Sequence, residues 1–388
     1  INTIRERHGR LQLVSGAAIR KNLTLPGSHE LSRKADVDTF ISILIPFRDR
    51  VELTSKCVES IQINASASIP YEIILIDNGS VETETHSWVE QVTEINTNIH
   101  CQRVDAPFNF SRLNNGARQL CRGNYLLFLN NDIELCSSNV LDDLLHPFAH
   151  PSTAAVGAKL KYPDGSLQHQ GVVLIKGERR CVLEPGKHLR EMDVIASLLP
   201  LRTQEEFSAA SAACLMVKAD CFDNIGGFDE ELAVVFNDVD LCLRLREAGG
   251  RIVVSPRPDI IHHESISRGK DLYGEAWARH QRESGRLRHK HQLLYKNGDP
   301  LTSPLLHHHS NRYEPAPPAE LPNGPAREKI LYTWNRSQRG RHERTPLIFA
   351  QFEENPETPI RADILDLLHQ YRRHFHVQVV AATPALLQ

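Results

Sequence analysis

The regular alternation of short apolar runs with amphipathic segments constrains the fold of this chain more than any other feature. Three runs are almost continuously hydrophobic, as strands buried on both faces are: residues 40–46, 71–77 and 124–129. Helical patterns cover residues 51–62 and 111–121, with Ser111 as a candidate N-cap. This alternation predicts an α/β fold whose central sheet is mostly parallel and covered by helices on both faces.

The same pattern returns in the second half of the chain. Residues 159–205 are loosely patterned, as expected of a segment that recognises a particular substrate. Residues 212–217 and 252–254 are then predicted strands, and residues 239–248 are a predicted helix. Residues 271–295 are basic, rich in histidine and helical in pattern. The first domain is therefore expected to continue well beyond residue 250.

Four segments are predicted along the chain: an arm or short helical lead-in (1–38), the main α/β domain (39–300), a proline-rich linker (301–326) and the start of a second α/β domain (327–388). The last segment has apolar runs at 346–350 and 377–381 on either side of a helical pattern at 360–371. The chain opens on Ile1, which suggests a piece of a longer, multidomain protein.

Composition narrows the class of protein. Of 388 residues, 40% are hydrophobic and 24% are charged, as in soluble globular proteins. The net charge of -3 argues against general binding of nucleic acid. The eight cysteines show no CxxC pair and no zinc spacing, so reduced thiols and a cytoplasmic location are expected. No apolar stretch reaches the roughly 20 residues of a membrane span, which leaves peripheral association with the inner face of a membrane as the open alternative.

Polar residues directly follow the apolar run at 124–129. A carboxylate at the C-terminal end of a central strand lies where open α/β sheets bind ligands. It is also a natural ligand for Mg²⁺ or Mn²⁺ that bridges substrate phosphates. We therefore expect Asp132, with Asn131 beside it, to hold a divalent cation. Glu134 is interpreted as a solvated residue in preference to a supporting group of the metal site.

A second acid ends the strand at 71–77. Asp77 would suit the N3–H of uracil or thymine, and an aspartate that caps the turn at Asn78-Gly79 is an equally good interpretation. The segment 107–116 would bring amides and a helix N-terminus to the same nucleotide.

The third polar cluster lies at residues 236–240. Asp238 could remove a proton from an acceptor hydroxyl, but it also stands where a helix begins, so capping is the competing interpretation. For Asp240, complementarity to the helix dipole is explanation enough. His262 and His263 follow Asp238 at 24 and 25 residues and could supply a neutral imidazole to a metal, although most of the 20 histidines are expected to be structural.

Residues 40 to about 270 resemble a family 2 glycosyltransferase of the GT-A fold, particularly the bacterial rhamnosyltransferase-like branch. Seven motifs carry the resemblance in the right order: Ile43-Leu44-Ile45-Pro46, Ile76-Asp77-Asn78-Gly79-Ser80, 107–116, Leu129-Asn130-Asn131-Asp132, Gly226-Gly227-Phe228-Asp229-Glu230, Asn237-Asp238-Val239-Asp240 and 262–269. The family's DxD metal motif is Asn130-Asn131-Asp132 here, so only its last acid remains.

The resemblance implies inverting transfer of a sugar from a nucleotide-diphosphate donor, a dTDP- or UDP-sugar with dTDP-rhamnose as one candidate. Asp238 falls on the family's catalytic base. Asp132 falls on the metal-binding acid, and His262 matches the metal-binding histidine slightly better than His263 does. The metal would be Mn²⁺ or Mg²⁺. Donor contacts are expected from seven residues: Pro46, Phe47, Arg48, Asp77, Asn109, Asn131 and Arg268, the last as a bidentate clamp on the diphosphate.

The acceptor would be a hydroxyl of a growing surface polysaccharide or lipid-linked glycan, and Gln168, His169 and Glu184 are candidate contacts to sugar hydroxyls. A membrane-anchored acceptor would suit the basic stretch 279–296, although an ordinary solvated helix face is the preferred interpretation.

Two other classes of protein are alternatives. A sugar-phosphate nucleotidyltransferase would need a glycine-rich phosphate loop that residues 46–50 lack. A non-catalytic glycan-binding or scaffold module of a polysaccharide synthase is the remaining alternative, against which the retention of both Asp238 and His262 argues.

Overall fold

The computed structural model describes residues 2–7, 10–14, 39–66, 68–175, 181–185, 187–188, 205–263, 274–301, 347–352 and 377–382. The chain divides into two compact units. One comprises residues 35–315, and the other joins residues 1–34 to residues 316–388. The predicted segment limits stay a prediction, and the two units are described separately below.

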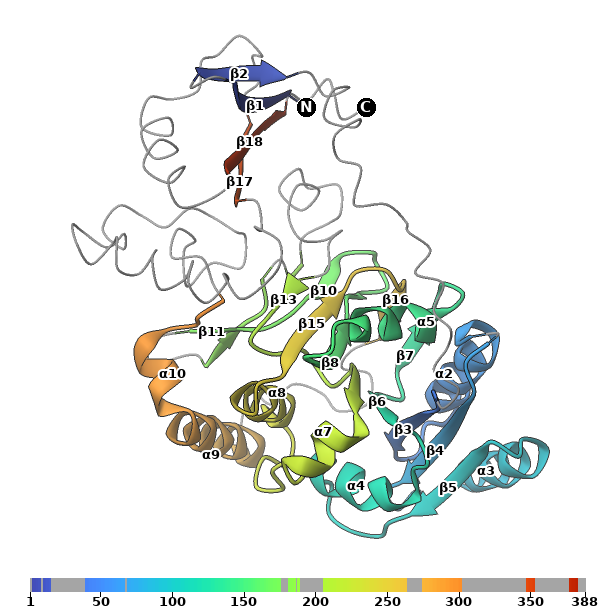
Figure 1. Cartoon of the computed structure of the whole chain (residues 1–388). Coiled ribbons are helices and arrows are strands. Elements are labelled where there is room, and N and C mark those ends of the chain that lie inside the picture. Colours follow the sequence, from blue (N-terminus) through green and yellow to red (C-terminus); the bar gives the residue numbers. More distant parts are fainter. Residues whose placement is uncertain are drawn as a thin grey trace. The chain divides into compact units, whose positions relative to one another are not determined.

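An eight-stranded mixed sheet forms the centre of the larger unit (Figure 1). Its strands, in spatial order, are β13 (Glu205–Glu206), β15 (Arg251–Ser255), β8 (Thr153–Ala158), β14 (Cys214–Lys218), β6 (Tyr125–Leu129), β3 (Ile41–Phe47), β4 (Tyr71–Asp77) and β5 (Ile99–Arg103). From β6 to β5 every pairing is parallel. β14 runs antiparallel to both β6 and β8, and β13 runs antiparallel to β15. The predicted mostly parallel α/β fold is confirmed.

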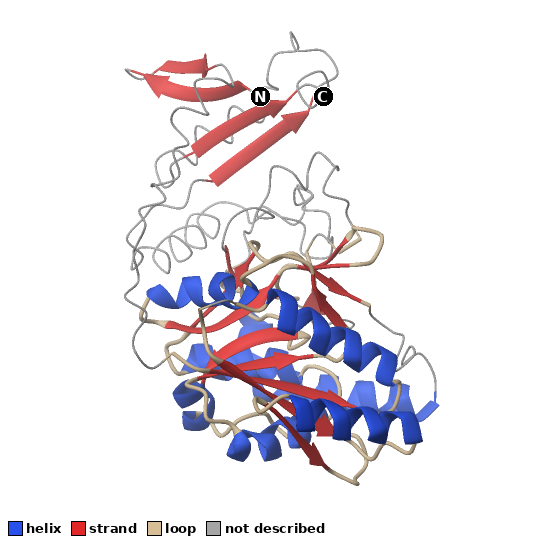
Figure 2. Ribbon diagram, turned by 90° about the vertical axis from the view of Figure 1, so that its right-hand side faces the viewer, coloured by secondary structure: helices blue, strands red, loops and turns tan. Residues whose placement is uncertain are grey.

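Helices lie on both faces of this sheet (Figure 2). One face packs against α2 (Val51–Asn64), α3 (Thr83–Ile95) and α5 (Val140–Leu145). The other packs against α4 (Phe110–Ala117), α7 (Ala219–Asn224), α8 (Asn237–Glu247), α9 (Gly274–Lys290) and α10 (Gln292–Asn297). Successive residues of a strand point to opposite faces, so Ile43 joins the first core and Leu44 the second. The continuous apolar runs of the sequence follow from this double burial.

A smaller sheet stands beside the C-terminal end of β6. It has the order β10 (Leu167–His169), β9 (Leu160–Lys161), β16 (Ile260–His262) and β7 (Ile133–Leu135). A separate hairpin joins β11 (Val173–Leu174) to β12 (Val182–Leu183). The sequence pattern indicated none of these short strands, because two or three residues are too few to display a period.

Several predicted elements need correction in their details. Asn109, not Ser111, caps α4, since the Asn109 side chain accepts a hydrogen bond from the Arg112 amide at 2.9 Å. The helix predicted to reach residue 121 ends at Ala117 and continues as a 3₁₀ turn over Arg118–Leu120. Helix α3 was not predicted at all. Its apolar residues Trp88, Val89 and Val92 pack against the core but are only partly buried.

The smaller unit contains a four-stranded sheet of order β17 (Leu347–Phe352), β18 (Val377–Ala382), β1 (Asn2–Arg7) and β2 (Arg10–Val14). The two C-terminal strands predicted from the sequence are confirmed, and they pair in parallel. The linker at 301–326 lies outside the described residues from residue 302 onward, as does the predicted helix at 360–371. Of the two alternatives for residues 1–38, the helical lead-in is wrong for Asn2–Arg7 and Arg10–Val14, which form an antiparallel pair of strands. β1 pairs with β18. The two strands are so distant in sequence that no local pattern could predict this pairing.

Candidate active site

Asp132 and His262 form a buried pair at the C-terminal edge of β6. The two residues are 5% and 8% exposed, and Asp132 Oδ1 lies 3.1 Å from His262 Nε2. The pairing of β16 with β7 brings them together, because His262 stands opposite Ile133 in that register. The backbone amide of His263 also donates to the Asp132 carbonyl oxygen at 2.9 Å. The topology therefore joins residues that are 130 positions apart in the chain.

His262 Nε2 faces Asp132 Oδ1 and also lies 3.4 Å from the side-chain nitrogen of Asn130. Nδ1 lies 2.7 Å from the side-chain oxygen of Gln168, which can only accept, so Nδ1 carries the hydrogen. Nε2 then presents a lone pair toward the carboxylate, an arrangement that a shared cation would stabilise. Two atoms 3.1 Å apart also match neighbouring ligands of an octahedral ion with bonds of about 2.1 Å. These two residues fit a divalent cation.

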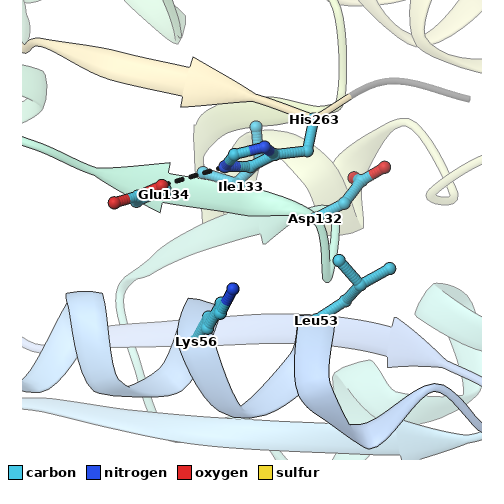
Figure 3. A pocket seen from close by; sticks show the side chains of 6 residues that line it. All are labelled: Leu53, Lys56, Asp132, Ile133, Glu134 and His263. Atoms are coloured by element: carbon cyan, nitrogen blue, oxygen red, sulfur yellow. Dashed lines mark hydrogen bonds and ion pairs between the residues drawn. The ribbon is translucent and has the colours of Figure 1, made fainter. Parts of the chain in front are cut away.

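His263 turns away from this pair. Its Nε2 lies 2.9 Å from Glu134 Oε2, and Figure 3 shows the ring directed along the strand toward that carboxylate. Both residues line a pocket of about 130 Å³ together with Leu53, Lys56, Asp132 and Ile133. Within the described part of the chain, no group of three or more His, Cys, Asp or Glu side chains is placed to hold a metal by itself. The choice between the two histidines thus favours His262.

Asp238 lies in the first turn of α8 and is held by backbone amides. Its Oδ2 accepts from the Ala212 amide at 3.1 Å, and its Oδ1 accepts from the Val239 amide at 2.8 Å. Burial raises the pKa of Asp238 above its ordinary value, and these two hydrogen bonds only partly oppose the rise. The residue before the helix is Phe236, in the left-handed region with φ 62°. Asp238 therefore does not occupy the capping position that the sequence left open.

One short backbone segment, Ser211–Ala213, touches both halves of the site. The Ala213 carbonyl accepts from the Asn130 amide at 3.0 Å, and the Ala212 amide donates to Asp238. The segment enters β14, whose pairing with β6 places Cys214 opposite Leu129. The antiparallel strand β14 thus joins the loop of Asp132 to the helix of Asp238.

Asp77 has protein partners on both oxygens. Oδ1 accepts from the Ser80 amide at 2.7 Å, which is the turn-capping role weighed from the sequence. Oδ2 lies 2.8 Å from Arg103 Nη1, a partner the sequence did not indicate. Contact with a base remains a prediction for Asp77, because these bonds leave acceptor sites on each oxygen.

The other predicted donor contacts come from several elements, and Phe47 lies beside Asp77 in the register of β3 on β4. Asn109 caps α4 and donates to the Glu230 carbonyl, and Asn131 donates to Thr54 Oγ1 at 3.0 Å. Pro46 and Phe47 end β3 and are buried, whereas Arg48 is exposed. Arg268 lies outside the described residues.

Sequence comparison assigns the part of the chain that carries Asp132 to a family. The profile described as "Glycosyl transferase family 2" matches residues 42–204. That stretch covers β3, β4, β6 and the Asp132 loop. This part of the chain belongs to glycosyltransferase family 2.

Relatives and a solved structure agree with this family. The O-antigen biosynthesis protein RfbC of Myxococcus xanthus is 35% identical over 61% of this chain and 18% of its own length. The N-acetylglucosaminyl-diphospho-decaprenol L-rhamnosyltransferase of Mycobacterium tuberculosis is 26% identical over 55% of this chain and 73% of its own length. The family 2 chain spans less than a third of the relatives that match it at 35% identity.

The crystal structure of GalNAc-T7 with UDP, GalNAc and Mn²⁺ matches with a TM-score of 0.52 and 14% identity, over 66% of this chain and 50% of that one. The glycosyltransferase therefore has the GT-A fold.

Sequence reasoning missed the contribution of α2 to the glycosyltransferase site. Leu53 and Lys56 line the pocket opposite Asp132 and Glu134 (Figure 3), and Thr54 accepts from Asn131. The spacing of Leu53 and Lys56 places them on one helix face. However, nothing in the sequence indicates which element that face meets. Within the described residues no helix is both long and apolar enough to cross a membrane.

Proposed function

We propose that this chain transfers a sugar from a nucleotide-diphosphate donor to a hydroxyl of a growing surface polysaccharide, with inversion and with a divalent cation. The observation that carries the proposal is the Ser211–Ala213 segment, which bonds the Asp132 loop through Asn130 and bonds Asp238 directly. An acid paired with an imidazole and a second acid of raised pKa are thereby fixed at one end of the sheet. Ligands bind at this end in open α/β folds.

Asp132 and His262 would hold Mn²⁺ or Mg²⁺. Two protein ligands suit such an ion, because it commonly keeps water and binds substrate phosphates in its remaining positions. When bound, the ion would neutralise the negative charge that develops on the departing nucleoside diphosphate. Gln168 supports this use of His262, since a hydrogen bond to the far ring nitrogen orients a metal-binding imidazole.

Asp238 would act as the general base. A pKa raised by burial brings a carboxylate closer to the operating pH, where a base removes protons most effectively. The amides of Ala212 and Val239 would hold the carboxylate in one orientation toward the acceptor hydroxyl. The deprotonated oxygen would attack the anomeric carbon on the face opposite the leaving group, and this direction of attack inverts the configuration.

The substrate class rests on the relatives. One is named for O-antigen biosynthesis and one for rhamnosyl transfer to a decaprenol-linked sugar. We therefore propose a dTDP- or UDP-sugar as donor, with dTDP-rhamnose as the first candidate, and a lipid-linked or growing glycan as acceptor. An enzyme of this kind would work in the cytoplasm, at the inner face of the membrane, as part of a larger synthase.

The test is turnover with a panel of UDP- and dTDP-sugars in the presence of Mn²⁺, read as release of nucleoside diphosphate. Asp238→Asn should lose at least a hundredfold in kcat with an unchanged far-ultraviolet circular dichroism spectrum. Asp220→Asn is the matched control, since Asp220 is exposed at the start of α7 and should keep full activity. Unchanged turnover in Asp238→Asn would remove Asp238 from this role. A chain that binds donor without turning it over would be a non-catalytic module.

A further inference from the structure

Two adjacent residues of β10, Gln168 and His169, reach opposite parts of the proposed site. The register of β10 on β9 shifts between Leu167 and His169, so Gln168 lies at an irregularity of the strand. Gln168 contacts His262, and His169 contacts the Ser211 amide. Both residues are buried, at 3% and 2% exposed. The sequence-based expectation that they meet sugar hydroxyls is not what their contacts show, because the polar groups of both bind protein.

Gln168 fixes the orientation of His262 from two directions. Its side-chain oxygen lies 2.7 Å from His262 Nδ1, and its side-chain nitrogen lies 3.4 Å from the His262 carbonyl oxygen. The Gln168 side-chain amide therefore contacts both the ring and the backbone of His262. A change at Gln168 would free the ring to rotate and would remove the partner that keeps the hydrogen on Nδ1.

His169 acts on the backbone segment that holds Asp238. The Ser211 amide donates to His169 Nε2 at 3.1 Å, so Nε2 is unprotonated and Nδ1 carries the hydrogen. Nδ1 lies 3.2 Å from Glu184 Oε1, and Lys187 Nζ lies 2.7 Å from Glu184 Oε2. The carboxylate and the lysine thus fix the tautomer in which His169 can accept. The next amide along the backbone, that of Ala212, donates to Asp238.

We propose that β10 is a positioning strand that holds the metal-binding imidazole through Gln168 and the base through His169. This inference rests on the proposed function and extends it to two residues that touch neither substrate nor metal. Glu184 supports it: burial alone would raise the pKa of Glu184, but the hydrogen bond from His169 and the charge of Lys187 lower it to about 2. Glu184 is therefore a fixed anion that anchors His169 at every working pH.

The positioning roles of Gln168 and His169 can be tested separately. The first probe is Mn²⁺ alone, titrated by calorimetry into the full chain. Gln168→Leu should weaken the affinity about tenfold, a typical effect of losing a partner of a metal-binding histidine. His169→Leu should bind Mn²⁺ within about twofold of the unsubstituted chain. Equal affinities in all three proteins would overturn the positioning role of Gln168. No Mn²⁺ binding by the unsubstituted chain would overturn the proposed metal site itself.

The second probe is turnover of the best donor in the panel. His169→Leu should lower kcat about tenfold or more and leave the donor KM within about twofold, because the base is displaced and the donor site is not. His169→Gln should recover most of the loss, since its side-chain oxygen can accept from the Ser211 amide. A purely structural role would not produce this separation of kcat from KM. Wild-type kcat in His169→Leu beside an inactive Asp238→Asn would overturn the inference and leave the proposed function intact.

A third measurement needs no donor. Amide hydrogen exchange in the peptide 208–216 should accelerate at least tenfold in His169→Leu, because the Ser211 amide loses its acceptor. The same peptide should exchange at the original rate in Gln168→Leu. Unchanged exchange in His169→Leu would show that His169 does not hold this segment and would overturn its positioning role.

Discussion

The buried carboxylate of Asp240 offers the sharpest prediction about stability. Asp240 is 0% exposed and follows the proposed base by two residues in α8. One oxygen lies 2.7 Å from Arg244 Nε, and the other lies 2.9 Å from His291 Nε2 and 2.8 Å from Lys290 Nζ. The acid therefore ties α8 to the end of α9 and to the turn that follows. Favourable placement near a helix N-terminus, the sequence-based explanation, accounts for only part of this.

The magnitude follows from the pKa. Burial alone would raise the pKa of Asp240, but the hydrogen bond from His291 and the charges of Arg244 and Lys290 lower it to about 2. The difference from an ordinary aspartate corresponds to about 2 kcal/mol of folding free energy. Because the folded-state pKa is the lower one, this stabilisation is complete above about pH 4 and is lost as the pH falls toward 2.

We predict that Asp240→Asn lowers the free energy of unfolding by about 2–4 kcal/mol at pH 7, the upper value reflecting three cationic partners left without their anion. Urea unfolding followed by circular dichroism measures the change at pH 7 and at pH 3. The decline in stability between these pH values should also be smaller in the variant than in wild type, by the part that Asp240 contributes. Asp223→Asn is the matched control, since the Asp223 side chain is 48% exposed in its pair with Arg118 and should contribute less than about 1 kcal/mol. A change in the free energy of unfolding of less than about 0.5 kcal/mol would refute the reasoning, because a single substitution typically changes it by roughly 1 kcal/mol.

Three further outcomes are expected. Removing divalent cations with EDTA should abolish turnover and adding Mn²⁺ should restore it; turnover that survives chelation would contradict the metal assignment. Because burial raises the pKa of Asp238, the acid limb of the rate–pH profile should lie above the ordinary aspartate value of about 3.9, and a limb at or below that value would argue against Asp238 as base. Gly171→Ala should destabilise the fold by about 2–4 kcal/mol, since Gly171 has φ +125° and an added Cβ would lie 2.3 Å from the Phe207 ring. A melting temperature equal to wild type in that variant would show that the 171–207 contact relaxes freely.

The sequence predicted the parallel half of the fold well because local pattern and tertiary environment agree there. β3, β4 and β6 are buried on both faces, so their apolar runs predict the ends of each strand to within a residue or two. The short strands of the side sheet were not predicted, because pairing between distant segments creates them. The same applies to β1, whose partner β18 lies at the other end of the chain.

For the site, the sequence by itself determined which residues are candidates for its chemistry. Asp132 after a buried strand, Asp238 at a helix start and two adjacent histidines could be named from residue type and local position. Only the tertiary structure decided how they combine. The register of β16 on β7 places His262, not His263, against Asp132. β10 supplies Gln168 and His169 from a stretch without any local pattern. A side chain's chemistry belongs to its residue, whereas its partners depend on strand register, which contacts between distant segments fix.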